Sequence, residues 1–230
     1  MTVRENNFEF ADSWAKSWCV EIFDTNADGE ISYDEEAAVQ DLTGLYYDPW
    51  IETFDEFQYF INVTSIPDKF FATNPSNSSG LRLESIILPK SIKSIGEKAF
   101  YLCKTLTKIE LPEGLESIGD RAFDDCSGLT EVKFPKSLKY ISGFTDCTGL
   151  TEVELPKSLK TIYEYAFYGC TGLTKVYCKP LTPPAVDRKY ESAPWQIFAD
   201  YCRIYVPRNS VELYKDADGW KDCDIRGYDF

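Results

Sequence analysis

A unit of 21 to 23 residues recurs through the middle of this 230-residue chain and constrains its fold more than any other feature. The unit opens on the pattern Leu-x-x-Ile/Val-x-Leu, with Phe or Cys as the last member in two copies, at Leu83, Leu106, Leu129, Leu150 and Leu173. A proline follows each of the first four copies, and isoleucine, phenylalanine and cysteine then recur in that order. One unit cannot bury its apolar side chains alone, whereas stacked units share a core, so the repeat predicts a solenoid.

Each unit is expected to form one coil of the solenoid. Its short strand ends at the proline, which cannot donate to a hydrogen-bond ladder, and strands of adjacent coils should pair in parallel about 4.8 Å apart. The isoleucine and the phenylalanine then enter the core from the opposite wall. We predict parallel pairing among the segments near Ile86, Ile109, Val132, Val153 and Val176. The unit that starts at Leu129 is two residues shorter than the others, around Gly143-Phe144.

Four cysteines keep the repeat spacing: Cys103, Cys126, Cys147 and Cys170. Stacked coils would bring their backbones within the range that a disulfide needs, but the repeat symmetry points their side chains in parallel. Cysteine is also among the residue types most often buried, so we predict reduced thiols in the core. A Cys178–Cys202 bridge is an open alternative. The sequence has no Cys-x-x-Cys pair, which disfavours metal binding by these thiols.

The run Leu-Pro-x-x-Leu-x-x-Ile-Gly-x-x-Ala-Phe-x-x-Cys-x-x-Leu, from Leu111 to Leu129, resembles the BspA-like leucine-rich repeat of bacterial surface proteins. The resemblance covers roughly residues 61–178, and the tail over residues 204–221 is similar to the C-terminal cap that often ends such arrays. It implies a bacterial, usually exported protein with an adhesive or ligand-binding function, located outside the cell or on its surface. The N-terminal residues show no apolar export signal, which leaves a cytoplasmic location open.

Residues 24–35 read Asp-Thr-Asn-Ala-Asp-Gly-Glu-Ile-Ser-Tyr-Asp-Glu and fill every required place of the 12-residue EF-hand loop. The side chains at positions 1, 3, 5 and 12 and the carbonyl at position 7 supply oxygen ligands, the serine at position 9 holds a water, and Gly29 allows the sharp turn. We therefore predict a calcium site formed by Asp24, Asn26, Asp28, Glu30, Ser32 and Glu35. The alternative is an acidic turn that only mimics the motif.

The flanks of this loop predict two helices and a cap for the solenoid. Apolar spacing indicates a helix over residues 11–23, and a capping box at Ser32 opens a second helix through Leu42. The aromatic residues expected to dock this unit on the first coil are Trp14, Trp18, Phe54, Phe57 and Phe60. Because solenoids need capped ends, structural calcium is favoured over a sensory role. Residues 216–219 resemble the start of a second loop, but we expect them to end a C-terminal helix at Gly219.

Composition excludes several classes of function. The net charge of −14 is concentrated in residues 1–65, which hold 15 acidic against 2 basic residues, as a cation-binding segment would. No basic stripe is present, which disfavours a nucleic-acid partner. The chain has no histidine, the commonest general base and a frequent ligand of zinc and iron. No apolar run approaches the ~18 residues of a transmembrane segment.

The sequence therefore predicts an α/β fold, a leucine-rich-repeat solenoid with a short parallel β-sheet. Residues 1–60 form a helical EF-hand cap, residues 61–180 the solenoid, and residues 181–230 a mixed C-terminal cap. The favoured function is non-catalytic binding of a protein or glycan ligand, with calcium as a structural cofactor. The candidate binding face consists of exposed strand positions: Lys108, Glu110, Glu131, Lys133, Glu152, Glu154, Lys175 and Tyr177. A sheet face that is exposed to water and binds no ligand would show the same mixture of charges.

Other functions stay open. The stretch 183–201, with Tyr190, Trp195 and Phe198, is a second candidate contact region, although these aromatics are rather expected to seal the last coil. The calcium loop would also suit a dockerin-like assembly module, but dockerins pair two such loops, and this chain has one. A hydrolase accessory domain is a further alternative. An enzyme is disfavoured, because carboxylate pairs such as Asp124-Asp125 are expected at a turn of the repeat with no pocket.

Overall fold

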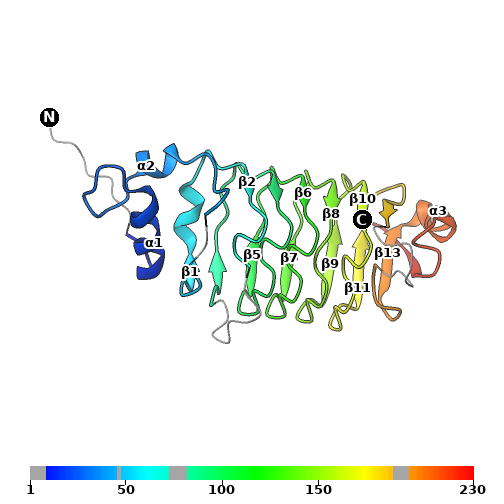
Figure 1. Ribbon diagram of the computed structural model, residues 1–230. Helices are drawn as coiled ribbons and strands as arrows, with labels where there is room; N and C mark the ends of the chain where they lie inside the picture. The colour runs from blue at the N-terminus through cyan, green and yellow to red at the C-terminus, as the bar shows by residue number, and fades with distance from the viewer. Residues whose placement is uncertain (1–8, 46–47, 73–81, 189–196) are drawn as a thin grey trace.

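The computed structural model describes residues 9–45, 48–72, 82–188 and 197–230, and these form an elongated solenoid (Figure 1). The coils stack along one axis, with the first two helices at the N-terminal end and the last helix at the other end. Two walls of short parallel strands run along the stack, and apolar side chains from both walls meet between them. The repeat architecture predicted from the leucine pattern is confirmed.

The first wall contains the strands that the leucine pattern predicted. Its members are β1 (Thr53–Phe54), β3 (Ser85–Ile86), β5 (Lys108–Glu110), β7 (Glu131–Lys133), β9 (Glu152–Leu155), β11 (Lys175–Cys178), β13 (Arg203–Pro207) and β14 (Asp224–Tyr228). The pairing is parallel: β1 pairs with β3, Ile109 of β5 lies beside Val132 of β7, and Val153 of β9 lies beside Val176 of β11. These contacts confirm the predicted parallel arrangement.

The sequence pattern did not predict that the second wall would also be a sheet. Its six strands are β2 (Ser65–Ile66), β4 (Ser94–Ile95), β6 (Ser117–Ile118), β8 (Tyr140–Ile141), β10 (Thr161–Tyr163) and β12 (Ala185–Asp187). They pair in parallel in the order β2-β4-β6-β8-β10-β12. The recurring isoleucines point into the core from this wall, and each is at most 2% exposed: Ile95, Ile118, Ile141 and Ile162.

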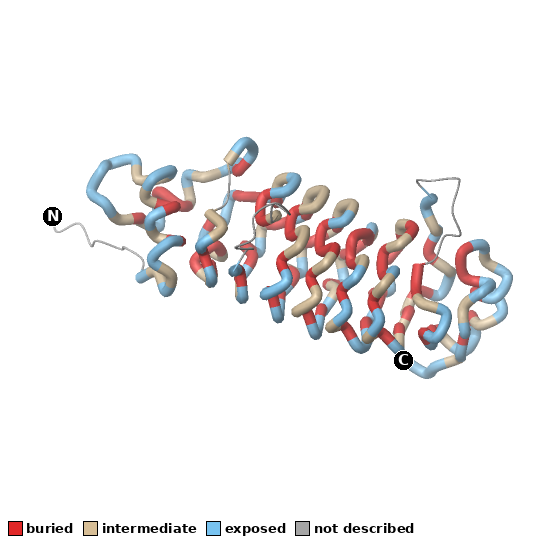
Figure 2. The backbone as a smooth tube through the Cα atoms, turned by 60° about the horizontal axis from the view of Figure 1, so that its bottom comes forward, coloured by how far each residue is buried: buried red, intermediate tan, exposed pale blue. Residues whose placement is uncertain are grey.

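Six phenylalanine rings form a continuous stack through the centre of the solenoid. Their neighbouring ring centroids are 4.8 to 5.5 Å apart, in the order Phe71, Phe100, Phe123, Phe144, Phe167 and Phe198. Figure 2 shows that buried positions recur on coil after coil along the whole molecule. Offset stacking adds about 0.5–1.5 kcal/mol per ring pair to the burial of the rings, so the stack links the coils energetically.

The cysteine ladder lies beside this stack. Each thiol donates to the carbonyl of the phenylalanine in the preceding coil, at 2.9 to 3.1 Å, for Cys103, Cys126, Cys147 and Cys170. All eight cysteines are free, and seven of them are buried. The predicted reduced ladder is therefore confirmed. The alternative bridge is not formed, since Cys178 and Cys202 are both free thiols.

The N-terminal cap consists of α1 (Ser13–Phe23), α2 (Tyr33–Ala38) and the 3-10 helix η1 (Asp55–Tyr59). α1 begins two residues later than predicted, because the Asp12 carboxylate caps it by accepting from two backbone N–H groups. The predicted capping box opens α2. That helix ends at Ala38 and not at Leu42, because Val39 takes an extended conformation, with ψ 122°.

Aromatic rings dock this cap on the first coil. Trp18 packs edge-on against Phe54, with ring centroids 5.8 Å apart, and Phe57 packs edge-on against Phe71 of the central stack at the same distance. Trp18, Phe54 and Phe57 therefore act as predicted, and Phe60 is also fully buried. Trp14 is not part of this buried cluster, since it is 51% exposed and its ring stacks on Trp50, with ring centroids 6.2 Å apart.

The C-terminal cap contains the 3-10 helix η2 (Arg208–Ser210) and α3 (Val211–Asp216). α3 ends at Asp216 because Ala217 is already extended, so the prediction that Gly219 stops the helix is wrong. Gly219 instead lies in the following turn, with φ +90°. Phe198 seals the last coil by stacking on Phe167, as one of our two alternatives held. Tyr190 and Trp195 lie outside the described residues.

Candidate functional site

The predicted calcium loop is closed by hydrogen bonds from its own backbone. The Asp24 carboxylate accepts from the N–H groups of Ala27 at 2.7 Å and Gly29 at 2.9 Å. Asn26 and Asp28 each accept from the N–H two residues ahead, at 2.8 and 2.9 Å. Ala27 and Gly29 both have positive φ, which gives the loop the sharp turn that the motif requires.

The last predicted ligand, Glu35, is 8% exposed and accepts four hydrogen bonds. Two come from the N–H and hydroxyl of Thr25, at 2.8 and 2.9 Å, and two from the N–H and hydroxyl of Ser32, at 3.0 and 2.8 Å. Burial alone would raise the pKa of Glu35, but these bonds outweigh it and lower the pKa to about 2. The side chain of Glu30 pairs with Lys16 at 2.7 Å. The calcium ligand predicted at this position is therefore the backbone carbonyl oxygen of Glu30.

The six predicted ligands suit calcium by their chemistry, but the structure does not bring their acidic side chains together. All six predicted ligands supply oxygen, the donor that calcium prefers. Within the described part of the chain, however, no three Asp, Glu, Cys or His side chains lie close enough together to hold a metal ion. The carboxylates of Asp24, Asp28 and Glu35 instead accept hydrogen bonds from nearby N–H groups. The donor set fits calcium, and calcium binding stays a prediction.

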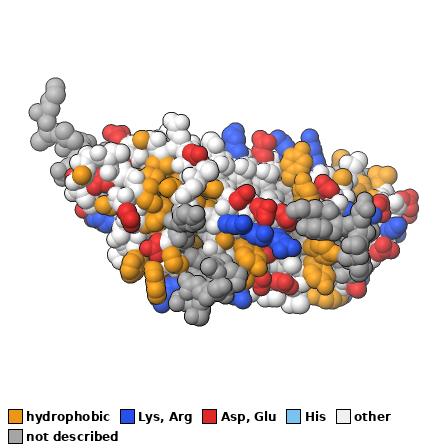
Figure 3. Space-filling view, in the orientation of Figure 1, with side chains coloured by type: hydrophobic (Ala, Val, Ile, Leu, Met, Phe, Trp, Pro, Cys, Tyr) orange, Lys and Arg blue, Asp and Glu red, His pale blue; other side chains and the backbone are white. Residues whose placement is uncertain are grey.

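The structure gathers the eight predicted binding-face residues on the outer side of the first wall. They come from β5, β7, β9 and β11, between the inward-facing Ile109, Val132, Val153 and Val176. Three ion pairs join six of them: Lys108–Glu110 at 2.7 Å, Lys133–Glu131 at 3.1 Å and Lys175–Glu152 at 4.0 Å. Figure 3 shows basic and acidic side chains intermingled over β5 to β9. We refer to this surface as the charged face.

An aromatic cluster, which sequence reasoning found only in part, continues the charged face toward the C-terminus. Its members are Tyr177 of β11, Tyr205 of β13, Tyr228 of β14 and Phe230, with ring centroids of neighbours 5.0 to 5.8 Å apart. Tyr228 and Phe230 are 42% and 47% exposed. Tyr177 was predicted as a contact residue, whereas the others lie beyond the repeat. The alternation of polar and apolar residues over β13 was the available signal for Tyr205. We call this group the tyrosine cluster.

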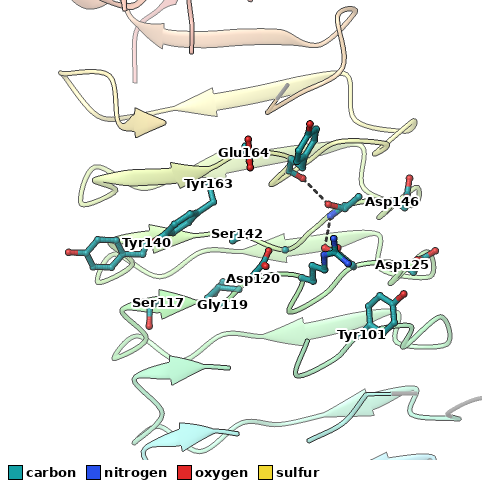
Figure 4. Close-up of a pocket in the computed structure, with 16 residues that line it drawn as sticks. Tyr101, Ser117, Gly119, Asp120, Asp125, Tyr140, Ser142, Asp146, Tyr163 and Glu164 are labelled. Carbon is teal, nitrogen blue, oxygen red and sulfur yellow. Dashed lines mark hydrogen bonds between the residues drawn. The ribbon is translucent and has the colours of Figure 1, made fainter. Parts of the chain in front are cut away.

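The second wall carries a cavity of about 700 Å³ between β6, β8, β10 and the turns that follow them (Figure 4). The expectation that Asp124-Asp125 lies at a turn without a pocket is wrong, because both residues line this cavity. The coil beside them is the one that lost two residues at Gly143-Phe144, which opens the space that these carboxylates border. The shortened repeat unit was the feature of the sequence that could have indicated this cavity.

Asp124 is the most buried aspartate of this cavity, at 7% exposure. Its carboxylate accepts from the Thr145 N–H at 3.1 Å. Burial raises the pKa of Asp124 to about 7, with repulsion from Asp120 adding to the rise, while the bonds from Thr145 and the charge of Arg121 oppose it. Glu164, 6% exposed, borders the same cavity from the coil beyond the shortened one.

The two walls of parallel strands around a phenylalanine core define a leucine-rich-repeat solenoid. The sequence pattern of the BspA type leucine-rich repeat region matches residues 64–182, in six copies. The chain therefore belongs to the BspA-type leucine-rich-repeat family. No curated protein matches it. None of the helices in the described ranges is long and apolar enough to span a bilayer.

Several solved structures are similar to this chain. The leucine-rich repeat protein of T. pallidum is 36% identical over 50% of this chain and 52% of its own, with a TM-score of 0.46. The pneumococcal vaccine antigen PcpA is 17% identical over 77% of this chain and 59% of its own, with a TM-score of 0.44. A leucine-rich repeat protein from Bacteroides ovatus is 24% identical over 76% and 54%, with a TM-score of 0.36. The chain thus spans between half and three fifths of the length of these proteins.

Proposed function

We propose that this chain is a non-catalytic binding module that recognises a protein ligand with the first wall of its solenoid. The observation that carries the proposal is the tyrosine cluster at the end of the charged face. Exposed tyrosines rimmed by charged residues are the groups that most often dominate the energetics of protein interfaces. Membership of a leucine-rich-repeat family supports the proposal, because such proteins commonly bind proteins. A location on the bacterial cell surface, typical of the family, belongs to the same proposal.

The charged face suits recognition because its charges contribute little to folding. Exposed pairs such as Lys108–Glu110 contribute little to stability because water and salt screen them, so they can exchange for contacts to a ligand. The strands that present them are fixed by a buried stack, so the face is ordered before binding. Tyr205 stacks on Tyr177 at 5.1 Å, which holds the aromatic end in place as well.

A parallel screen tests this assignment. The wild type, Tyr228→Ala and Leu213→Ala are each incubated with an array of purified proteins and an array of glycans. Leu213 is 54% exposed on α3 and serves as the matched apolar control. We expect proteins bound by the wild type to bind Tyr228→Ala at least about tenfold more weakly, and Leu213→Ala unchanged. Equal binding of all three chains would refute the tyrosine cluster as the site, and binding confined to glycans would favour a glycan ligand.

We further propose that the N-terminal loop holds a structural calcium ion, with Asp24, Asn26, Asp28, Ser32, Glu35 and the Glu30 carbonyl as its donors. The oxygen-only donor set and the positive φ at Gly29 support this assignment. Bound calcium would neutralise the carboxylates of the loop. Because the cap that carries the loop packs on Phe71 through Phe57, that stabilisation would extend to the first coils.

A further inference from the structure

The cavity on the second wall results from one shortened coil between two full-length ones. Four residues link the inward isoleucine to the stacked phenylalanine in the coils on either side, from Gly119 to Ala122 and from Tyr163 to Ala166. Only Ser142 and Gly143 make this link in the coil between them. The longer turns of both neighbours therefore project past the shorter one and border an open slot (Figure 4).

Gly143 forms the floor of this slot and requires the absence of a side chain. Its φ is +79°, and a Cβ at this position would lie 2.2 Å from the backbone nitrogen of Ala122. The shortened turn therefore passes directly against the preceding coil, where its carbonyl accepts from the Phe123 N–H at 2.6 Å. This close approach keeps the slot open, because the turn lies deep against its neighbours and does not fill the gap between them.

The lining of the slot combines carboxylates with aromatic rings. Its ionisable residues are Asp120, Asp124, Asp125, Asp146 and Glu164, with Arg121 as the single basic residue. Its aromatic residues are Tyr101, Tyr140, Tyr163 and Tyr165. Among the described residues, no three acidic side chains lie close enough together to share a metal ion. The carboxylates therefore line the slot without converging on one point, and the slot volume of about 700 Å³ is within the range of small-ligand pockets.

We propose that this slot binds an organic cation, an ammonium group carried on an aliphatic chain. Ammonium groups donate strong hydrogen bonds to carboxylates, which accept them, and tyrosine faces attract cations while their rings cover the aliphatic carbons. Asp124 and Glu164 are more than nine-tenths buried, which is costly for charged groups, and an entering cation compensates that cost. An anionic ligand would meet repulsion from the same groups. A neutral ligand would lack the attraction that a cation has for these carboxylates.

This site is separate from the proposed protein-binding face. The slot opens on the wall of β6, β8 and β10, whereas the tyrosine cluster lies on the wall of β11, β13 and β14. Either assignment can therefore fail without the other. The organic cation could be a free polyamine or the lysine side chain of a larger molecule, since both present the same group.

Calorimetric titration of the full chain with three probes tests the proposal. The probes are spermidine, Nα-acetyl-lysine-N-methylamide, and the same lysine derivative acetylated at Nζ, which keeps the chain but removes the charge. We expect binding of at least one of the first two, no binding of the neutral derivative, and weaker binding as the salt concentration rises. Spermidine alone would identify a polyamine site, and the lysine derivative a site for basic side chains. Absence of binding by both cations would overturn the proposal, as would equal binding of the neutral derivative.

Matched variants locate the binding in the slot. Asp124→Asn keeps the shape of the side chain, and Tyr163→Leu removes an aromatic face; each should weaken cation binding, Asp124→Asn by at least about tenfold. Asp216→Asn and Tyr201→Leu make the same chemical changes at exposed positions outside the slot and should bind as the wild type does. Unfolding curves confirm that each variant is folded. If all four variants bind the cation as the wild type does, the cation binds elsewhere and the assignment is refuted.

Discussion

Replacing Asp124 by asparagine should stabilise the chain at neutral pH and change little in acid. The Asp124 carboxyl is 7% exposed, and burial, assisted by repulsion from Asp120, raises its pKa from 3.8 to about 7. Hydrogen bonds from Thr145 and the charge of Arg121 oppose this rise without cancelling it. In the unfolded chain the same group ionises near its ordinary pKa of about 3.9.

Between pH ~4 and ~7 the folded state therefore keeps a proton that the unfolded state has lost. The free energy of unfolding falls as the pH rises through this window and levels off above it. A rise of about three pKa units corresponds to at most about 4 kcal/mol, at ~1.36 kcal/mol per unit. Because water enters the cavity and screens the charge, we expect about 2 kcal/mol.

Thermal unfolding at pH 4.5 and pH 8 measures this contribution. Asparagine keeps the size of the side chain and cannot ionise, so Asp124→Asn should melt about 4–8 °C above the wild type at pH 8 and close to it at pH 4.5. Asp216→Asn, an exposed change on α3, should shift the Tm at neither pH. An Asp124→Asn variant that gains no stability at pH 8, or the same amount at both pH values, would refute a raised pKa.

Three further predictions concern the loop, the ladder and the slot floor. Glu35→Gln should lower the Tm in millimolar calcium and barely change it in chelator. Bound calcium should stabilise the wild type by about 2.7 kcal/mol at a hundredfold excess over Kd. A wild-type Tm that does not change on chelation would contradict structural calcium. Thiol titration should find Cys126 and its ladder neighbours protected in the native state and all eight cysteines reactive in denaturant; fewer than eight would indicate a disulfide. Gly143→Ala should lower the free energy of unfolding by about 3 kcal/mol or more, as measured by thermal unfolding. Gly44 has a similar φ of +82° but open space around it, so Gly44→Ala should lower that free energy by about 1 kcal/mol. Equal losses would contradict the close approach at Gly143.

The sequence predicted the first wall because its signal is periodic and repeated. A strand such as Glu152–Leu155 alternates exposed and buried residues, and the same alternation returns one coil later. The second wall escaped prediction because its strands are mostly two residues long, as in Ser94–Ile95, and two residues carry no alternation to detect. The isoleucine alone showed that this segment faces the core, and its pairing depends on the stacked neighbours.

The tyrosine cluster and the slot depend on contacts that no single repeat encodes. Tyr205 and Tyr228 come from β13 and β14, outside the repeat period, so alignment of the repeats could not place them beside Tyr177. The two-residue loss at Gly143 was visible in the sequence, but its effect depends on the lengths of the turns on both sides. Asp124 therefore looked like a residue of an open turn, although the adjacent coils bury it.

The slot lies outside the phenylalanine stack, so the shortened coil can form the slot without disturbing the core. Phe144 stacks on Phe123 at 4.9 Å, the same distance that separates Phe123 from Phe100, and the Cys147 thiol still donates to the Phe123 carbonyl at 3.1 Å. The shorter turn therefore keeps both the phenylalanine stack and the cysteine ladder. The coil before it contains a buried carboxyl, Asp124, whose raised pKa means that it destabilises the folded state at neutral pH. Destabilising groups retained on a stable scaffold are typical of binding sites. If Asp124→Asn both raises the Tm at pH 8 and weakens spermidine or lysine binding, the same carboxyl would be shown to reduce stability and to bind the cation.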